Sequence, residues 1–262
     1  MPDRSGELVL VEEARRGVTI LALNRPEKRN ALSVRLIDAL CRAITEIEAD
    51  HLQRVVILKG EGPAFCSGLD LTEAAEPASA EHMARGVERL LRAVRGSSLV
   101  SIASVHGTAA AGGAGLVSAC DFAVAADDAR IGYPEVHRGL VPALVMTFLI
   151  RQVGERSARE LVLLGEMISA SQALAMGLVN RVVPRAECLD YALTLADRVL
   201  QGAPGAVVRT KRALEELAGF NLDADLVRAR EHHLAARSSL EAQEGLAAFL
   251  EKRPPHWEQK RG

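Results

Sequence analysis

Apolar residues recur in short runs through the first two thirds of the chain. Residues 7–12 and 18–23 are β-rich runs separated by the turn-like sequence ARRG, which predicts a hairpin or two adjacent strands. Further apolar runs at 55–59 (VVILK), 99–105 (LVSIASV) and 122–126 (FAVAA) predict three more strands.

Helical spacing appears between these runs. Ser33 is placed to cap a helix whose apolar positions recur at spacings of four and three, and a more polar helix is expected at about 80–95. The apolar positions of the first helix are Leu36, Leu40, Ile44 and Ile47.

The pattern changes from Pro142 onward to nearly continuous helix, interrupted by a β-like stretch at 178–183 (LVNRVV). Alternating strands and helices followed by helices predict an α/β layered core with a helical C-terminal region. The Gly-Ala-Pro-Gly break at 202–205 is the expected point where the last helices leave the core. We therefore expect a core over residues 1–202 and a C-terminal helical region over 203–262.

Composition narrows the class of protein. The 262 residues are 48% hydrophobic and 25% charged, with a net charge of -2, as in an ordinary soluble protein with a sizeable core. This balance gives no basic field for nucleic acid. No apolar run approaches the roughly 20 residues that span a bilayer, and the start of the chain lacks a secretory pattern, so a cytoplasmic protein without membrane contact is expected.

Cysteine and histidine spacing argues against a disulfide framework or a zinc site. There is no C-x-x-C and no H-E-x-x-H, and the adjacent pair His232 and His233 is interpreted as part of a solvated helix face. The four cysteines lie far apart, at Cys41, Cys66, Cys120 and Cys188.

Two glycine-rich turns follow strands: GPAFCSGLDL at 62–71 and GTAAAGGAGLVSACD at 107–121. Glycine inside regular structure is destabilising, so something must require bare backbone there. Each turn leads toward a helix start, where amide N–H groups lack intrahelical partners. If the turns face each other, two N–H groups can converge on one oxygen and form an oxyanion hole.

Two alternatives remain at this point. Glycine turns after strands often serve only to let helix and strand pack closely. The second alternative is a dinucleotide-binding site, but Gly113 and Gly115 supply only the first two glycines of G-x-G-x-x-G, and Ser118 stands at the third position.

Taken together, these segments resemble the crotonase, or enoyl-CoA hydratase/isomerase, superfamily. The resemblance runs nearly end to end, through LNRPEKRNAL at 23–32, AFCSGLDL at 64–71, the run from VHGTAAAGG to HRGLVP at 105–142, and AFLEKRPPHW at 248–257. Several motifs in the right order make the signal specific.

The resemblance implies a spiral of ββα units with C-terminal helices that pack trimers, commonly paired as hexamers. It implies an acyl-CoA substrate, as in fatty acid metabolism, with coenzyme A as part of the substrate and no separate cofactor or metal. By the family pattern, the oxyanion donors are the N–H groups of Leu69 and Gly112, although Ala111 stands where the glycine triplet usually begins.

The same resemblance assigns the catalytic acid and base. Most hydratases of this family use two glutamates; the downstream one is present as Glu135, whereas the upstream position is Gly115. Two carboxylates suit addition of water, while one base suits movement of a double bond, because it can shuttle one proton between two carbons. Glu135 alone therefore favours isomerisation, with hydration still open, and a catalytically weak acyl-CoA-binding homologue is the rival from another class.

Substrate contacts are also implied by the resemblance. Lys28 and Arg29 fit the nucleotide phosphates, and Lys252 could reach a phosphate from a terminal helix. The full set of expected substrate-binding residues is Lys28, Arg29, Ala31, Cys66, Gly68, Asp70, Gly113, Gly115 and Lys252.

Neighbouring segments complete these expectations. Residues 142–144 lack the aspartate that halide displacement on aromatic thioesters needs. His137 and Arg138 lie just beyond Glu135, and either could line the pocket, but Arg138 before Gly139 is more often a structural ion-pair partner, and neither is assigned a chemical role. Residues 73–95 are expected to close the acyl pocket, whose chain-length preference the sequence does not fix.

Overall fold

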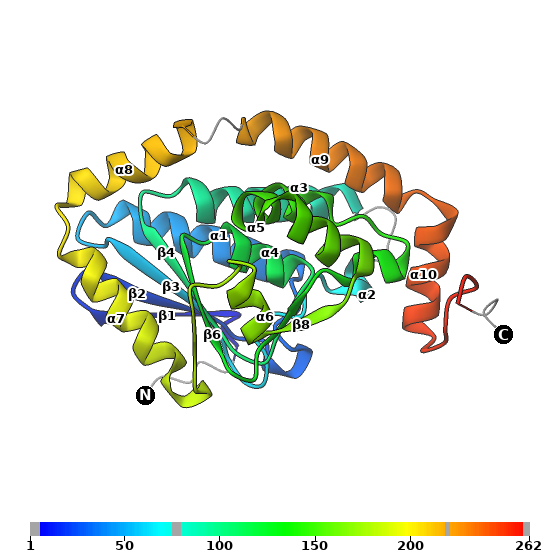
Figure 1. The fold of residues 1–262 in the computed structure, drawn as a ribbon, viewed down its shortest axis with the longest axis horizontal. Coiled ribbons are helices and arrows are strands. Elements are labelled where there is room, and N and C mark those ends of the chain that lie inside the picture. Colours follow the sequence, from blue (N-terminus) through cyan, green and yellow to red (C-terminus); the bar gives the residue numbers. More distant parts are fainter. Residues whose placement is uncertain (1–5, 75–79, 218–220, 259–262) are drawn as a thin grey trace.

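The computed structural model describes residues 6–74, 80–217 and 221–258. A six-stranded sheet with the order β1-β2-β3-β4-β6-β9 lies at its centre (Figure 1). The β1–β2 hairpin is antiparallel and every other pair in this sheet is parallel. The strands are β1 (Val9–Arg15), β2 (Val18–Leu23), β3 (Val55–Gly60), β4 (Val100–Val105), β6 (Phe122–Ala126) and β9 (Arg181–Val183).

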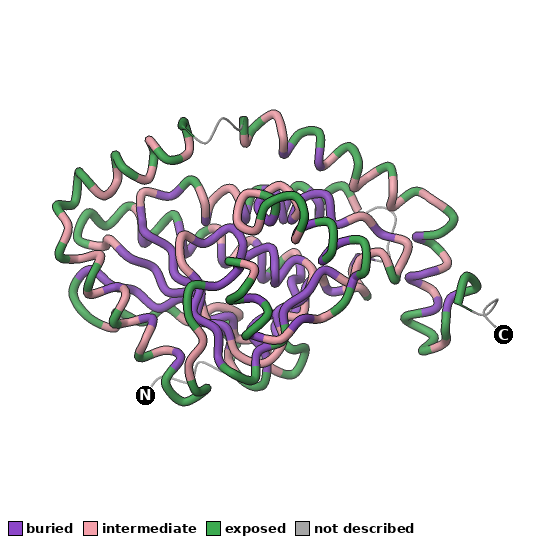
Figure 2. The backbone as a smooth tube through the Cα atoms, viewed as in Figure 1, coloured by how far each residue is buried: buried purple, intermediate pink, exposed green. Residues whose placement is uncertain are grey.

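Helices cover both faces of the sheet, and buried residues concentrate between the layers (Figure 2). One face packs against α1 (Val34–Ala49), α3 (Ala80–Gly96), α4 (Gly112–Ala119) and α5 (Ala143–Leu164), the last broken at Gly154, where φ is +72°. The other face packs against α7 (Cys188–Leu200). Strands covered on both faces explain why β2 and β4 are fully buried and read as continuous apolar runs.

Three short strands form a second sheet that the sequence pattern did not predict. Strand β5 (Thr108–Ala110) pairs parallel with β7 (Arg130–Gly132), and β7 pairs antiparallel with β8 (Met167–Ser169). The Ala111 N–H donates to the Gly132 carbonyl at 2.9 Å. This small sheet therefore fixes where the second glycine turn lies.

Three C-terminal helices, α8 (Pro204–Leu217), α9 (Leu222–Arg237) and α10 (Leu240–Leu250), arch away from the sheet and along the outside of α3 and α5 (Figure 1). Helix α8 buries no residue. It is attached by charge: Lys211 Nζ lies 2.7 Å from Asp121 Oδ2, and Glu215 pairs with Arg95 and Arg151. Helix α9 packs against α3 and α5, and α10 contacts η3 (Pro134–Arg138).

Short elements connect these layers. They are η1 (Pro26–Lys28), α2 (Leu71–Ala74), α6 (Ala170–Ala175) and η4 (Arg185–Glu187).

The predicted α/β fold with C-terminal helices is confirmed. All the strands predicted from apolar runs are present, and the Ser33 hydroxyl caps α1 by accepting from the Leu36 N–H at 3.2 Å. Helix α7 ends at Leu200, just before the predicted break at 202–205, and α8 begins within it, at Pro204. The division into a core and a C-terminal region at residue 202 stays a prediction.

Candidate active site

The two glycine turns lie against each other. Parallel bridges join Cys66 to Ala109 and Leu32 to Leu69. Gly68 has a φ of +93°, and a Cβ there would lie 2.8 Å from the Ala110 carbonyl oxygen and 3.4 Å from the Gly112 nitrogen. Only glycine adopts this backbone without strain while allowing so close an approach. The sequence placed these glycines correctly as sites where bare backbone is required.

Local hydrogen bonds leave one amide free in each turn. The Leu32 N–H donates to Gly68 and the Asp70 N–H donates to Leu32, so the N–H of Leu69, between them, points to the opposite side of the strand. Gly112 is the first residue of α4, where N–H groups have no intrahelical acceptor. Within residues 6–74, 80–217 and 221–258, neither the Leu69 nor the Gly112 N–H donates a hydrogen bond.

Ala111 precedes the second amide in an unusual conformation. Its φ is +51° and its ψ is -121°, outside the regions that a residue with a Cβ prefers. Its N–H is held by Gly132, which keeps the turn in place. The alanine in the first position of the glycine triplet therefore leaves the turn formed and the Gly112 amide available.

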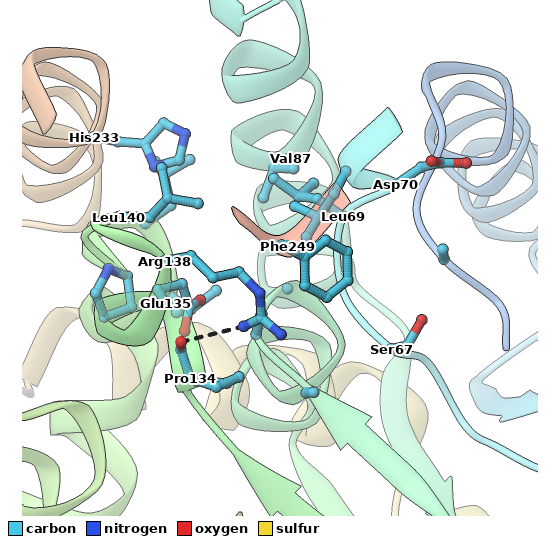
Figure 3. A pocket seen from close by; sticks show the side chains of 18 of the residues that line it. Ser67, Leu69, Asp70, Val87, Pro134, Glu135, Arg138, Leu140, His233 and Phe249 are labelled. Carbon is cyan, nitrogen blue, oxygen red and sulfur yellow. Dashed lines mark hydrogen bonds between the residues drawn. The ribbon is translucent and has the colours of Figure 1, made fainter. Parts of the chain in front are cut away.

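Both turns border a cavity of about 280 Å³ (Figure 3). Its size suits a small ligand. Helices α3 and α5 contribute apolar side chains to its wall, while η1, the first turn and η3 contribute charged ones. The apolar lining includes Ala84, Val87, Leu140, Val141, Leu144 and Val145, and the charged lining is Lys28, Arg29, Asp70, Glu135 and Arg138.

Glu135 reaches this cavity from η3. Its Oε2 atom is buried and has no hydrogen-bond partner among the described residues. Burial raises the pKa of Glu135 to about 7, against the opposing effects of its own backbone N–H and of Arg138. A carboxyl group with this pKa can both release and take up a proton near neutral pH.

Arg138 lies on the same side of η3 as Glu135 (Figure 3). A 3-10 helix has three residues per turn, so positions three apart are eclipsed. The Arg138 guanidinium lies 4.8 Å from the centre of the Phe249 ring, and its Nη1 donates to the Pro134 carbonyl at 3.2 Å. The interpretation of Arg138 as a structural ion-pair partner is wrong, because in the described part of the chain it pairs with no carboxylate and its buried Nε has no acceptor.

Helix α10 supports η3 by backbone contact. A Cβ on Gly139 would lie 2.4 Å from the Glu241 carbonyl carbon, and one on Gly245 would lie 2.3 Å from the Arg138 carbonyl oxygen. Sequence reasoning missed this contact. Gly139 and Gly245 are more than 100 positions apart, so they indicate a contact between η3 and α10 only once the fold is known.

The structure brings seven of the predicted residues to the cavity and leaves five away from it. Those that line it are Lys28, Arg29, Ala31, Leu69, Asp70, Gly112 and Glu135. Those that do not are Cys66, Gly68, Gly113, Gly115 and Lys252.

The predicted residues behind the lining act through packing. Cys66 is fully buried, and burial raises the pKa of its thiol to about 12, so it is an unreactive filler. A Cβ on Gly113 would lie 2.2 Å from the Cys66 carbonyl oxygen. A Cβ on Gly115 would lie 2.3 Å from Val145 Cγ1, so Val145 fills the space that a side chain at position 115 would need.

Asp70 is engaged on the protein side. Arg25 Nη1 lies 2.7 Å from its Oδ2, and Asp70 Oδ1 accepts from the Thr72 N–H. Burial acts to raise the pKa of Asp70, but the hydrogen bond and charge of Arg25 bring it below its ordinary value. Asp70 therefore stays ionised and holds the first turn to η1.

His233 was interpreted as part of a solvated face, and this is wrong for it. It lies on α9, lines the cavity, and its Nδ1 is 3.4 Å from the Val141 carbonyl oxygen, whereas His232 is exposed. Burial lowers the pKa of His233 below its ordinary value. Of residues 73–95, which are expected to close the acyl pocket, Ala84 and Val87 line the cavity and residues 75–79 lie outside the described residues; closure of an acyl pocket stays a prediction.

Searches for metal-binding and membrane-spanning features in the described segments give negative results. No group of three or more His, Cys, Asp or Glu side chains could hold a metal ion. No helix there combines the length and apolar character needed to cross a bilayer.

Comparisons with known proteins agree with this geometry. The family profile described as enoyl-CoA hydratase/isomerase matches residues 13–260. A Thermus thermophilus protein provisionally named enoyl-CoA hydratase is 39% identical over 95% of this chain and 100% of its own. The 2,3-dehydroadipyl-CoA hydratase of Escherichia coli is 35% identical over 95% of this chain and 97% of its own.

A solved structure extends the likeness to three dimensions. The crystal structure of an enoyl-CoA hydratase from Mycobacterium avium superposes with a TM-score of 0.86 at 33% identity, over 96% of this chain and 99% of that one. The protein described here therefore belongs to the enoyl-CoA hydratase/isomerase family.

Proposed function

We propose that this enzyme acts on an enoyl-CoA thioester, with the N–H groups of Leu69 and Gly112 binding the thioester oxygen and Glu135 moving the proton. One observation carries the proposal: two amides and one buried carboxyl oxygen, all without partners among the residues that the structure describes, border the same cavity. Buried polar groups without partners are costly, and they are characteristic of sites that await a ligand.

The chemistry follows from where charge develops. Loss of a proton from C2, or addition at C3, places negative charge on the thioester oxygen as an enolate forms. Two N–H groups fixed by the turns stabilise that charge more than they stabilise the ground-state carbonyl. Each such donor contributes on the order of 2.7–4 kcal/mol in other enzymes.

Glu135 is the proton carrier in this proposal. In isomerisation of a 3-enoyl thioester, its carboxylate removes a proton from C2 and the same carboxyl group returns it to C4, which leaves a 2,3 double bond. In hydration, Glu135 takes a proton from water as the oxygen bonds to C3, and the same carboxyl group then passes that proton to C2. Its pKa of about 7 suits either direction of transfer.

The packing at Gly115 favours the first of these reactions. The place of a second carboxylate is filled by Val145, so a single acid must do all proton transfer at this wall. Isomerisation needs one such group. Hydration is the second candidate, favoured by relatives and solved structures that carry hydratase names.

Contacts to the coenzyme A moiety follow from the cavity rim. Lys28 and Arg29 line the cavity on η1, where their charges can meet phosphates, and we propose them as the nucleotide contacts. Lys252 follows α10 and does not line the cavity. Assembly into trimers or hexamers, which would bring Lys252 to another copy, and a cytoplasmic location stay predictions.

The test is an assay of 2-enoyl- and 3-enoyl-CoA thioesters of several chain lengths with wild type and Glu135→Gln. Removing the proton carrier should lower kcat by about 100- to 10,000-fold. Glu155→Gln is the matched control, because Glu155 is exposed and pairs only with Arg159 one turn away.

The outcome distinguishes an active enzyme from an acyl-CoA-binding homologue. Turnover lost in Glu135→Gln, with acyl-CoA binding kept in both variants, supports catalysis. Tight binding without turnover of any thioester by wild type identifies an acyl-CoA-binding homologue instead.

A further inference from the structure

The guanidinium of Arg138 is a cation on the cavity wall with unused hydrogen-bonding capacity. Its Nε is buried and lacks an acceptor among the described residues, and its one hydrogen bond there joins Nη1 to the Pro134 carbonyl. A buried donor without a partner costs free energy, and a desolvated charge without a counter-charge costs more. A negatively charged ligand group therefore fits next to the Arg138 guanidinium.

The carboxylates that the described residues place on the cavity wall do not meet that need. Asp70, which also lines the cavity, is taken by Arg25 at 2.7 Å. Glu135 lies close enough to feel the charge of Arg138 but is not ion-paired with it. The carboxyl of Glu135, whose pKa is about 7, is also half protonated at neutral pH and so is a poor permanent counter-ion.

Two neighbouring residues determine the orientation of the Arg138 guanidinium. Phe249 covers it at 4.8 Å from CZ to ring centre, and Pro134 holds Nη1. The edge formed by Nε and Nη2 has no acceptor among the described residues, and an edge of the guanidinium fork can bind a carboxylate through two parallel hydrogen bonds. The missing partner thus has the chemistry of a carboxylate.

We propose that Arg138 binds a carboxylate carried by the acyl chain beyond the reacting carbons, so that the preferred substrates are enoyl-CoA thioesters of short dicarboxylic acids. The proposal rests on the proposed function and deepens it. Arg138 and Glu135 are one 3-10 turn apart, about 6 Å along the helix axis, so a carboxylate at Arg138 lies a few bonds beyond the carbon that Glu135 serves. This spacing indicates acyl chains of about five or six carbons.

Apolar lining elsewhere in the cavity is compatible with this substrate. Val87, Leu144 and Val145 can contact the methylene carbons, while Arg138 supplies one specific polar contact. A site built to bind a charged group rejects the analogue that lacks it, because its own buried donor is then left unpaired.

The direct test compares two saturated thioesters of six carbons, adipyl-CoA and hexanoyl-CoA, by isothermal titration calorimetry. They differ only in a terminal carboxylate against a methyl group. Wild type should bind adipyl-CoA at least about 10-fold more tightly, as expected of a charge-assisted hydrogen-bonded pair. Equal affinity, or tighter binding of hexanoyl-CoA, overturns the proposal.

Variants assign the preference to one residue. Arg138→Met keeps an apolar stem against Phe249 and should abolish the preference for adipyl-CoA, and Arg138→Lys should restore part of it. Arg159→Met, at an exposed arginine on α5, is the matched control and should keep the wild-type ratio. A preference that survives in Arg138→Met contradicts the proposal. If Arg138→Met does not fold, the wild-type comparison still decides.

Turnover supplies the second readout. With 5-carboxy-2-pentenoyl-CoA and 2-hexenoyl-CoA, Arg138→Met should lower kcat/KM for the former at least about 10-fold more than for the latter. A residue that merely positioned Glu135 would lower both equally, which also overturns the proposal. The calorimetric comparison uses no turnover, so it stands if the proposed reaction fails; conversely, turnover without carboxylate preference leaves the proposed reaction intact.

Discussion

The cavity has two walls built in different ways. One, the amide wall, presents the N–H groups of Leu69 and Gly112, and what positions them is close contact between backbone segments at Gly68 and Gly113. The other, the carboxyl wall, presents the side chains of Glu135 and Arg138.

This difference determines which amino-acid substitutions each wall tolerates. The amide wall depends on which residues are glycine and is indifferent to the side chain of the donor itself. The carboxyl wall depends on the identity of its side chains and on the backbone of α10 behind η3. Substitutions that add a Cβ should therefore damage the two walls through different contacts.

Among the substitutions that add a Cβ, the largest effect is expected on the amide wall. In Gly113→Ala the new Cβ would lie 2.2 Å from the Cys66 carbonyl oxygen, a backbone atom that cannot rotate away, so the two turns must separate. We expect kcat/KM to fall about 100- to 1000-fold, as when an oxyanion donor is lost. The measurement is steady-state kinetics alongside circular dichroism to verify the fold.

The control for this variant is Gly96→Ala, where a Cβ would meet nothing within 4 Å. A folded Gly113→Ala enzyme with activity close to that of the control would show that the turns need not touch.

The next effect concerns the support of the carboxyl wall. In Gly245→Ala the Cβ would meet the Arg138 carbonyl oxygen at 2.3 Å and push α10 away from η3. We expect kcat/KM to fall about 10- to 100-fold through misplacement of Glu135, with the sheet intact. Activity and thermal melting, measured side by side, check this; a drop in melting temperature without loss of activity would mean that α10 stabilises η3 but does not position it.

A smaller effect is expected on stability through Glu135. Its folded pKa, about 7, is above its ordinary value of 4.5, so the folded state binds more protons between these values. The contribution of Glu135 to stability is thus fully present below the unfolded pKa and is lost as pH rises through the folded pKa. Glu135→Gln should gain about 2–3 kcal/mol relative to wild type between pH 5 and pH 8. Urea unfolding at both pH values measures the gain, and a difference that does not change with pH would contradict a raised pKa.

The smallest effect tests the space beside the second turn. Gly115→Ala should cost about 1–3 kcal/mol, because its Cβ would lie 2.3 Å from Val145 Cγ1. Val145→Ala removes that methyl group, so the double variant should cost about 1 kcal/mol less than the sum of the two single ones. Strict additivity in urea unfolding would show that Val145 is not what excludes a side chain at position 115.

Much of the fold could be predicted because its strands are long apolar runs and its first helix carries its own cap. The strands β5, β7 and β8 could not, since each has three residues and no alternation to detect. Their pairing depends on residues far apart in sequence, as does the contact between Gly139 and α10.

The candidate site shows the same division. The glycine turns and Glu135 could be predicted. Backbone that another segment approaches closely requires glycine, and the glutamate stands within a motif that resembles the family. Arg138 could be named only as one of two residues that could line the pocket, and His233 could not be found, because a charged or polar residue looks alike in sequence whether it faces water or a cavity. Only the eclipsed spacing of Glu135 and Arg138 in η3 was available as a signal, and it needed the helix type to be known.

Helix α8 is held to the core largely by charges that water reaches only in part. It buries no side chain, and besides the packing of Val207 it is fastened by Lys211 and Glu215, whose side chains are 11% and 27% exposed. Dissolved salt screens ion pairs shielded to this degree only weakly, whereas removal of one partner leaves a poorly solvated charge without compensation. The attachment of α8 therefore depends on the identity of these few side chains more than on the salt around the protein.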